Sequence, residues 1–402
     1  MTASPARRYD LDWLRVIAFG VLIFYHIGMF YVTWDWHVKS PHAGPAAELP
    51  MVLVNIWRLE LLFFISGVAL RYASDKAGLG AGAHLGFAGQ RFWRLAAPIV
   101  FGMAVVVAPQ SYFQLLQQGE IAPGFWRFYP DYLSFAQKFS VITPTWNHLW
   151  YVVYMLFYSM IALAAAPLLR PLANALSRVR GAGTAILLLA PLPFLAYRYL
   201  LEPQFPTTHA LVDDWATHAH SFTIFLFGFI VAKNEGFWRA VRRALPVAAP
   251  VAAACATIIG FVWLGDRWEA IRSNPVAAAL FPALRIVYLW SVILTIAGLG
   301  MRFLDRDSKT LRYLTNGVFC YYILHQTIIV AAGYYLARLD LSWQAEFAVL
   351  SVLTVAGCGL GYEAVRRIPV LRPFFGVSGK GASRPARTGH APRAAALCDD
   401  TA

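Results

Sequence analysis

The chain is short of charged residues. Only 14% of its 402 residues are Asp, Glu, Lys or Arg, whereas 59% are hydrophobic and 15% are aromatic. With a mean hydropathy of +0.53, such a chain cannot form a water-facing surface of ordinary composition. The composition therefore excludes an ordinary soluble domain and predicts a membrane protein with several spans.

Cysteine is scarce as well. The sequence has four: Cys255, Cys320 and Cys358 lie in apolar stretches, and Cys398 lies close to the C-terminal end. Their spacing matches neither a disulfide framework nor a metal cluster. The Asp and His residues between 213 and 220 also lack a recognised zinc spacing. We therefore expect no metal site.

Long apolar runs are abundant, and their lengths fit the roughly 20 residues that cross a bilayer. They predict an all-α, polytopic transmembrane bundle of about ten helices. The expected spans lie near 12–33, 50–70, 93–113, 147–168, 183–201, 217–233, 246–264, 277–300, 314–337 and 343–365.

The basic residues indicate the orientation of these spans. Placing the N-terminus in the cytoplasm puts most of the 34 Lys and Arg residues on the cytoplasmic side, as the positive-inside rule expects. With ten spans both termini are then cytoplasmic, and the net positive charge needs no nucleic-acid partner. We expect a membrane domain over 1–370 and a disordered basic cytoplasmic tail over 371–402.

The first apolar run contains both a cation and a histidine. Ten residues separate Arg15 from His26, and eleven helical steps return to nearly the same face about 16 Å further along the axis. Ionisable side chains at that depth are costly and usually face the bundle interior, where they serve function. We expect His26 to be catalytic; the alternative is a histidine that only hydrogen-bonds a neighbouring helix.

The second apolar run places Arg58 and Glu60 near mid-depth. A carboxylate there needs a partner, and Glu60 comes to a depth comparable with that of His26. We predict that Glu60 accepts the imidazole N–H and orients the ring as a base. Alternatively, Glu60 pairs with Arg58 or Arg285 and only stabilises the bundle.

Two further patterns suggest binding sites. Arg91 and Arg94 are three residues apart, hence on one helix face at the cytoplasmic side, where two guanidiniums suit phosphate; arginines there can also be simple topology anchors. Aromatic and polar residues in two other spans suit a polyol substrate, although His325 alone can equally be a packed histidine. The predicted substrate-binding set is Arg58, Asn147, His148, Trp150, Tyr151, Tyr322 and His325.

Together these patterns resemble acyltransferase family 3, a family of integral membrane acyltransferases. The resemblance covers roughly residues 9–370, and the opening around Asp10–Arg15 is most similar to the glucan-modifying, succinyl-transferring branch. Four motifs in the family's order carry it: Arg15 with His26, Phe63-Phe64-Ile65-Ser66-Gly67, Arg91-Phe92-Trp93-Arg94, and Tyr321-Tyr322-Ile323-Leu324-His325.

The resemblance implies a multi-pass enzyme of a bacterial inner membrane. It would move an acyl group, acetyl or succinyl, from cytoplasmic acyl-CoA to a hydroxyl of an extracytoplasmic glycan or glycolipid, with no permanently bound cofactor. Arg71, Arg91 and Arg94 would then hold the phosphates of CoA, and Arg15 would guide its arm. His26 would act as a general base or carry the acyl group itself.

A proton-coupled secondary transporter is the alternative. Intramembrane His, Arg and Glu side chains also build proton relays. Against a transporter, the two halves of the sequence show no matching pair of broken helices.

Overall fold

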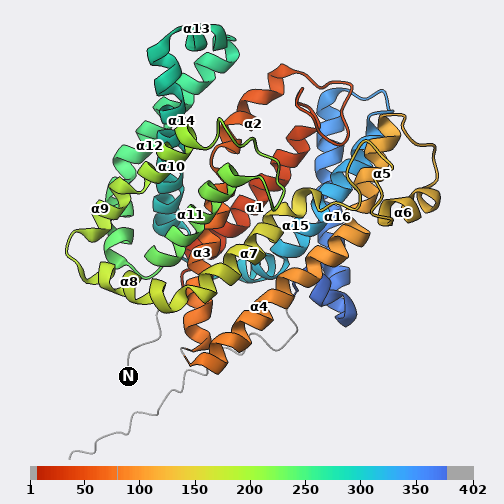
Figure 1. The fold of residues 1–402 in the computed structure, drawn as a ribbon. Helices are drawn as coiled ribbons and strands as arrows, with labels where there is room; N and C mark the ends of the chain where they lie inside the picture. The colour runs from red at the N-terminus through yellow and green to blue at the C-terminus, as the bar shows by residue number, and fades with distance from the viewer. Residues whose placement is uncertain (1–6, 79, 378–402) are drawn as a thin grey trace, which may run out of the picture.

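The computed structural model describes residues 7–78 and 80–377, and in this part of the chain every regular element is a helix, as predicted. The elements run through the bundle in the order shown in Figure 1. The first half contains α1 Tyr9–Met29, η1 Pro45–Ala47, α2 Glu48–Asn55, α3 Arg58–Ala77, α4 Ala81–Phe101, η2 Gly102–Val106, α5 Ala108–Gln117, α6 Phe125–Leu133, η3 Asn147–Leu149, α7 Trp150–Ala164 and α8 Ala166–Arg178. The second half contains α9 Ala182–Leu189, α10 Pro191–Leu200, α11 Trp215–Val231, α12 Glu235–Leu264, α13 Trp268–Ser273, α14 Pro275–Phe303, α15 Lys309–Leu336, α16 Trp343–Arg367 and η4 Pro369–Phe375.

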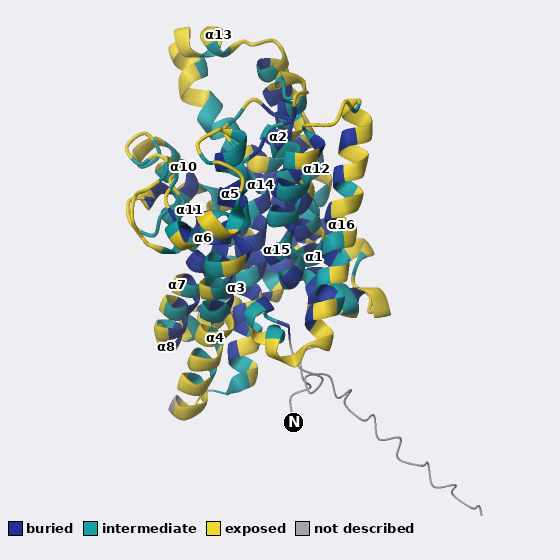
Figure 2. Cartoon of the chain, turned by 90° about the vertical axis from the view of Figure 1, so that its right-hand side faces the viewer, coloured by how far each residue is buried: buried dark blue, intermediate teal, exposed yellow. Residues whose placement is uncertain are grey.

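Nine helical stretches among the described residues are long and apolar enough to cross a membrane. The tenth expected span, near 217–233, is α11, which has 17 residues and is shorter than the others. The protein is thus a multi-pass helical bundle. Buried residues fill its middle, and exposed residues lie on the outer helices and around α13 (Figure 2).

Close helix contact in the bundle depends on glycine. Gly67 of α3 faces the carbonyl oxygen of Phe225 on α11, and Gly228 of α11 faces that of Phe64 on α3; a Cβ at either glycine would overlap that oxygen. Small residues let two helix backbones approach in this way where lipid gives no hydrophobic drive for association. The Ser-Gly end of the α3 motif therefore has a packing role.

The predicted span at 93–113 is interrupted. A π-helical turn, η2, joins α4 to α5, and such turns often occur at functional sites. Side chains satisfy carbonyls that the irregular turn frees. Tyr132 donates to Met103 at 2.7 Å, and Thr327 donates to Val106 at 2.6 Å. The turn sets the position from which α5 extends beside α15.

The first and last described residues, 7 and 377, lie at the same end of the bundle (Figure 1). We call this end the terminal end. The predicted tail starts too early, because η4 is folded against α4: the ring centres of Phe101 and Phe374 are 4.8 Å apart. The apolar side chains around Phe374 favour this packing over disorder. The rest of the predicted tail, from 378, lies outside the described residues.

Candidate active site

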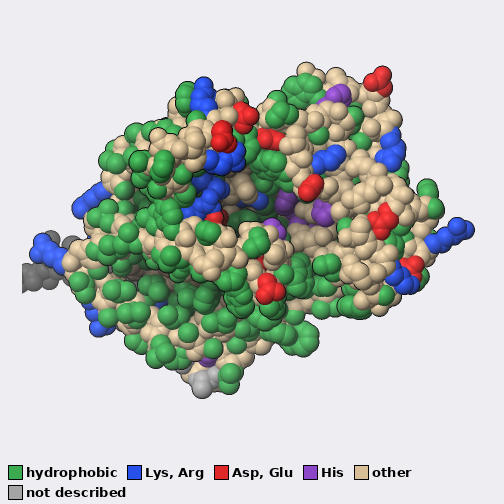
Figure 3. Space-filling model, turned by 45° about the horizontal axis from the view of Figure 1, so that its top comes forward, with side chains coloured by type: hydrophobic (Ala, Val, Ile, Leu, Met, Phe, Trp, Pro, Cys, Tyr) green, Lys and Arg blue, Asp and Glu red, His purple; other side chains and the backbone are tan. Residues whose placement is uncertain are grey.

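A cavity of about 1050 Å³ opens at the end of the bundle opposite the terminal end. Figure 3 shows histidine and arginine side chains on the walls of this hollow. Among the predicted site residues, the lining includes His26, Arg58, Glu60, Asn147, His148 and Trp150. The structure therefore brings together residues of α1, α3, η3 and α7 that are far apart in the sequence.

His26 on α1 is paired with His325 on α15. The Nδ1 atom of His325 lies 2.5 Å from the Tyr322 carbonyl oxygen, and since a carbonyl only accepts, this Nδ1 donates. The Nε2 atom of His325 is then the acceptor for His26 Nδ1, at 2.7 Å. The remaining nitrogen of His26, Nε2, keeps its lone pair, as a general base or nucleophile requires.

His148 is held next to this pair. Its Nε2 donates to the Ile323 carbonyl oxygen at 3.1 Å, and its Nδ1 accepts from Gln110 at 3.3 Å. Its ring also meets the edge of the His325 ring, with centres 5.1 Å apart. His148 is therefore oriented at both nitrogens as a neutral imidazole.

Gln110, on α5 just after the π-helical turn, organises the surrounding polar groups. Its amide nitrogen donates to His148 and to Thr327, and its oxygen accepts from Asn147 at 3.1 Å and from Gln326 at 3.0 Å. All four contacts of the amide come from other elements. Gln110 therefore fixes the positions of η3 and α15 around the cavity.

The network continues to His37, between α1 and η1. Gln326 donates to His37 Nε2 at 2.9 Å, and His37 Nδ1 donates to Gln114 at 2.6 Å. Burial lowers the pKa of His37, against the raising effect of its bond to Gln114. Sequence reasoning missed the roles of Gln110, Gln114 and Gln326, and the only signal was that Gln326 follows His325.

A lysine fixes the end of α1 above His26. Lys39 Nζ donates to the carbonyl oxygens of Met29 and Val32, both at 2.8 Å. A cation at a helix C-terminus satisfies free carbonyls and complements the helix dipole. Burial lowers the pKa of Lys39 to about 8, although Asp35 and Glu48 act in the opposite direction.

The opposite wall of the cavity has charged groups. Arg285 also lines it, and Glu60 lies among the charges of His220, Arg58 and Arg285. The hydrogen-bond partner predicted for Glu60, the His26 ring N–H, bonds His325 instead. That orienting contact is thus corrected: a neutral imidazole from α15 is closer to His26 than the carboxylate of α3.

Glu202 and His220 are two charged-wall residues that sequence reasoning did not select. Glu202 pairs with Arg198, and its carboxylate lies 3.2 Å from His220 Nε2. No motif marks Glu202, since it follows α10 in a stretch without a recognised pattern. The cavity thus has a neutral histidine wall and a charged wall that face one another.

Three predicted arginines gather between His26 and the terminal end. Arg15, Arg91 and Arg94 are close enough for their charges to repel one another. The Nε atom of Arg15 is buried without a hydrogen-bond partner, and Arg91 has only weak contacts to Ser159, at 3.4 Å. These side chains keep donors available for an anion.

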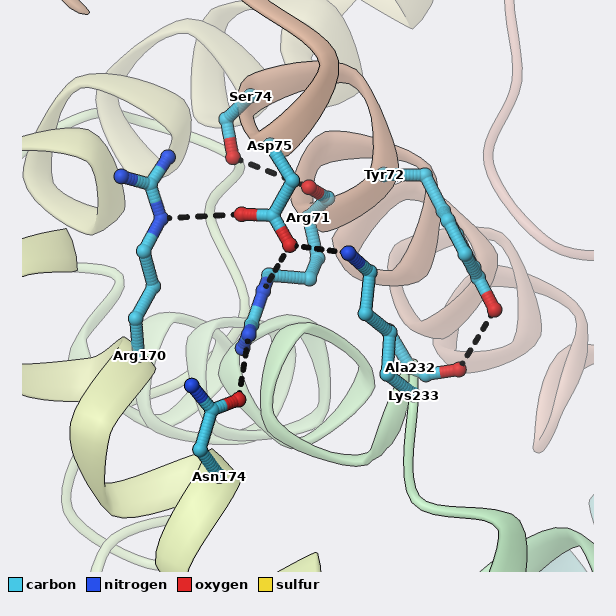
Figure 4. Close-up of polar contacts among 8 residues, drawn as sticks. All are labelled: Arg71, Tyr72, Ser74, Asp75, Arg170, Asn174, Ala232 and Lys233. Carbon is cyan, nitrogen blue, oxygen red and sulfur yellow. Dashed lines mark hydrogen bonds and ion pairs between the residues drawn. The ribbon is translucent and has the colours of Figure 1, made fainter. Parts of the chain in front are cut away.

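Arg71 has different surroundings. Its guanidinium donates to Asp75 at 2.9 Å and to Asn174 at 3.0 Å. Asp75 also pairs with Arg170 at 3.1 Å and with Lys233 at 2.5 Å (Figure 4). We name Arg71, Asp75, Arg170, Asn174 and Lys233 the Asp75 cluster. Because its donors are already paired, the predicted phosphate role of Arg71 has no support in this arrangement.

Tyr151 and Tyr322 do not reach the cavity. Tyr151 is 5% exposed and Tyr322 is 1% exposed. They lie one helical turn from His148 and His325, respectively, with their ring centres 5.9 Å apart. The substrate contact predicted for these two rings is thus corrected: their spacing from His148 and His325 places them a layer deeper. His325 is itself 0% exposed and meets His26 rather than the cavity, so its predicted substrate contact is corrected as well.

Residues 8–363 match the family described as the acyltransferase domain. The chain belongs to this acyltransferase family. The match covers nearly the whole of the described chain and includes both the paired histidines and the three gathered arginines. The protein is accordingly a membrane acyltransferase.

Named relatives agree with this family. The acyltransferase is 23% identical over 413 residues to glucans biosynthesis protein C of Salmonella schwarzengrund. The match covers 94% of this chain and 97% of the relative. The acyltransferase is 24% identical over 409 residues to the protein of the same name from Salmonella gallinarum, with the same coverage. No solved structure matches the chain.

Proposed function

We propose that the protein transfers an acyl group from cytoplasmic acyl-CoA to a hydroxyl of an extracytoplasmic glycan or glycolipid. The observation that carries this proposal is the free Nε2 lone pair of His26, fixed by His325 and located at the wall of a polar cavity. The relatives' printed name, glucans biosynthesis, supports a glycan as the acceptor.

The lone pair suits direct transfer. His26 Nε2 takes the proton of the acceptor hydroxyl while its oxygen attacks the thioester carbonyl; the C–S bond breaks, and the thiolate takes the proton from the imidazolium. In the alternative path Nε2 attacks the thioester first and passes the acyl group to the hydroxyl. In both paths His325 accepts the Nδ1–H and keeps the ring oriented.

The donor and the acceptor would approach from opposite ends. Arg15, Arg91 and Arg94 lie on the terminal side of His26, where guanidiniums can hold the phosphates of CoA. The cavity opens at the other end, and its Trp150 ring stacks on His209 with centres 4.2 Å apart. Aromatic and hydrogen-bonding groups of this kind suit a sugar. This layout fits a bacterial inner membrane with both termini in the cytoplasm.

The surroundings of Arg58 indicate which acyl group, acetyl or succinyl, the protein transfers. It is 6% exposed, its Nε has no hydrogen-bond partner, and its guanidinium carbon lies 3.5 Å from the centre of the Tyr25 ring, next to His26. A buried cation without an acid bonded to it favours an anionic ligand. This favours succinyl, whose free carboxylate can pair with Arg58.

Transfer can be tested in sealed inverted vesicles with acyl-labelled CoA outside and glycan inside. We expect label in the glycan, and a loss of about 10²- to 10⁴-fold in His26→Gln, the scale of a general base. Uptake of an unmodified substrate, with no labelled glycan, would favour the transporter instead. Labelled His26 would select the covalent path.

The donor site can be tested in the same vesicles. Arg91→Gln with Arg94→Gln should raise the KM for acyl-CoA and leave the KM for glycan unchanged, because only the donor has phosphates. Arg239→Gln is the matched control, since Arg239 is 62% exposed and pairs with Glu235. An unchanged KM for acyl-CoA in the double variant would refute the assignment.

A further inference from the structure

Four aromatic rings meet beneath the cavity. Phe19 lies 5.4 Å from Tyr322 and 6.2 Å from Tyr151, and Tyr151 lies 4.7 Å from Phe63, measured between ring centres. All four are buried, with exposed fractions of 5% or less. They come from α1, α3, α7 and α15, so four helices each contribute one ring. We call these four residues the aromatic layer.

The contacts between the rings place them at a similar depth, and the helical register shows on which side of the polar residues they lie. On α1 and α15 the ring precedes the polar residue, whereas on the oppositely directed α3 and α7 it follows, so each ring lies on the terminal side. Each lies one turn, or for α1 two turns, from that polar residue. The pairs are Phe19 with His26, Phe63 with Glu60, Tyr151 with His148 and Tyr322 with His325.

The arginines lie on the other side of the aromatic layer. Arg15 is one turn before Phe19 on α1, about 6 Å further toward the terminal end. Tyr151 is near both Arg15 and Arg91, and its hydroxyl lies 2.8 Å from Ser66 Oγ. The aromatic layer thus separates the cavity beside His26 from the region of the gathered arginines.

We propose that the aromatic layer is a closed gate on the donor path and that its rings limit which acyl groups pass. An acyl thioester held at the arginines reaches His26 only when the layer parts. Close packing leaves no room for a chain among the rings as they stand. That an acyl thioester passes from the arginines toward His26 rests on the function proposed above. The barrier itself follows from the packing of the four rings.

Cysteine labelling tests the barrier without any acyl transfer. Ser66→Cys places a thiol just below the aromatic layer, at a partly exposed position, in a His26→Gln protein whose four native cysteines are replaced by serine or alanine. A charged, membrane-impermeant thiol reagent is applied to sealed vesicles from one end at a time. With the layer intact, we expect labelling from the terminal end and little from the cavity end.

Removing one ring should open the path. Phe19→Ala should raise the labelling rate from the cavity end about tenfold or more, since it creates a void in a close-packed layer. The milder Phe19→Leu should give a smaller rise if the alanine variant fails to insert. Phe64→Ala is the matched control: Phe64 is 2% exposed and adjacent to Phe63, but it packs on Phe227 and Trp238.

The outcomes separate the two proposals. Fast labelling from the cavity end with all rings present would overturn the barrier, as would equal rates in Phe19→Ala and Phe64→Ala. None of these results depends on transfer, so loss of acyl transfer would refute the function alone. In the protein with His26 present, Phe19→Ala should also improve the use of a longer acyl-CoA relative to acetyl-CoA about tenfold, and an unchanged preference would refute the selection of acyl groups.

Discussion

The histidine network beside the cavity and the Asp75 cluster near the terminal end both bury polar groups, but they satisfy them differently. His26, His325 and His148 are linked by hydrogen bonds to neutral partners, and one nitrogen of His26 remains free. In the Asp75 cluster, one carboxylate receives three cations from three parts of the chain. The first group leaves a lone pair for chemistry, whereas the second shares one carboxylate among three cations.

This difference shows how a membrane bundle can separate stability from reactivity. Full charges in a poorly polarisable interior are stable only when paired closely, so they suit the joining of α3 to α8 and to the start of α12. Neutral imidazoles need only hydrogen bonds, and they can change protonation during a reaction. The predictions below test this division, beginning with the largest effect.

Asp75→Asn should lower the free energy of unfolding by about 3 kcal/mol, the low end for breaking a buried ion pair, because it leaves three cations without their shared acid while Asp75 is 16% exposed. Thermal or denaturant unfolding in detergent would measure this. Glu235→Gln is the control, since Glu235 is 88% exposed, and it should change little. His26→Gln should also leave stability nearly unchanged. Equal losses of stability in Asp75→Asn and His26→Gln would contradict the division between a stabilising cluster and a reactive network.

His325→Ala should lower kcat about 10²-fold and affect KM less, because His26 Nδ1–H loses its acceptor and the ring its orientation. His325→Gln should restore part of the rate, since the amide oxygen can accept the same hydrogen bond. Steady-state acyl transfer in vesicles gives both constants. A purely structural role would show no difference between the two variants at equal protein level.

Glu60→Gln should act on acceptor binding. With His325 bonded to His26, we expect the variant to keep kcat and to raise the KM for glycan about tenfold, the scale of one hydrogen bond to a charged group. Steady-state acyl transfer in vesicles, with the glycan concentration varied, measures both constants. A lower kcat with an unchanged KM would instead support the orienting role first predicted from the sequence.

Lys39→Met should give the smallest effect, on the pH dependence of stability. The folded-state pKa of about 8 lies below the ordinary value of 10.5, so the unfolded chain binds more protons between these two values. Stability of the native protein should then rise with pH from about 8 to 10.5. Melting temperatures across this window should show that slope weakened in Lys39→Met; identical slopes would contradict the prediction.

Much of the bundle could be predicted from the sequence, since each expected span is helical, although several of them are divided between two helices. Length and hydropathy suffice for this because a bilayer forces each crossing segment to satisfy its own backbone. The predicted start of the tail at 371 was wrong, because Phe374 packs on Phe101 in a long-range contact. Pro98 and Pro109 flank the interruption at η2, but the groups that stabilise it come from α6 and α15 and could not be predicted from this segment.

For the site, the sequence suffices to place Arg15 and His26 on one face of α1, because that follows from helix geometry within a single segment. Which partners those side chains meet was decided only by tertiary structure. His325 rather than Glu60 bonds His26, and Arg71 joins Asp75 rather than the other arginines. These two contacts depend on how separate helices rotate and cross. A hydropathy pattern indicates the depth of a residue in the membrane but not which residue of another helix it faces.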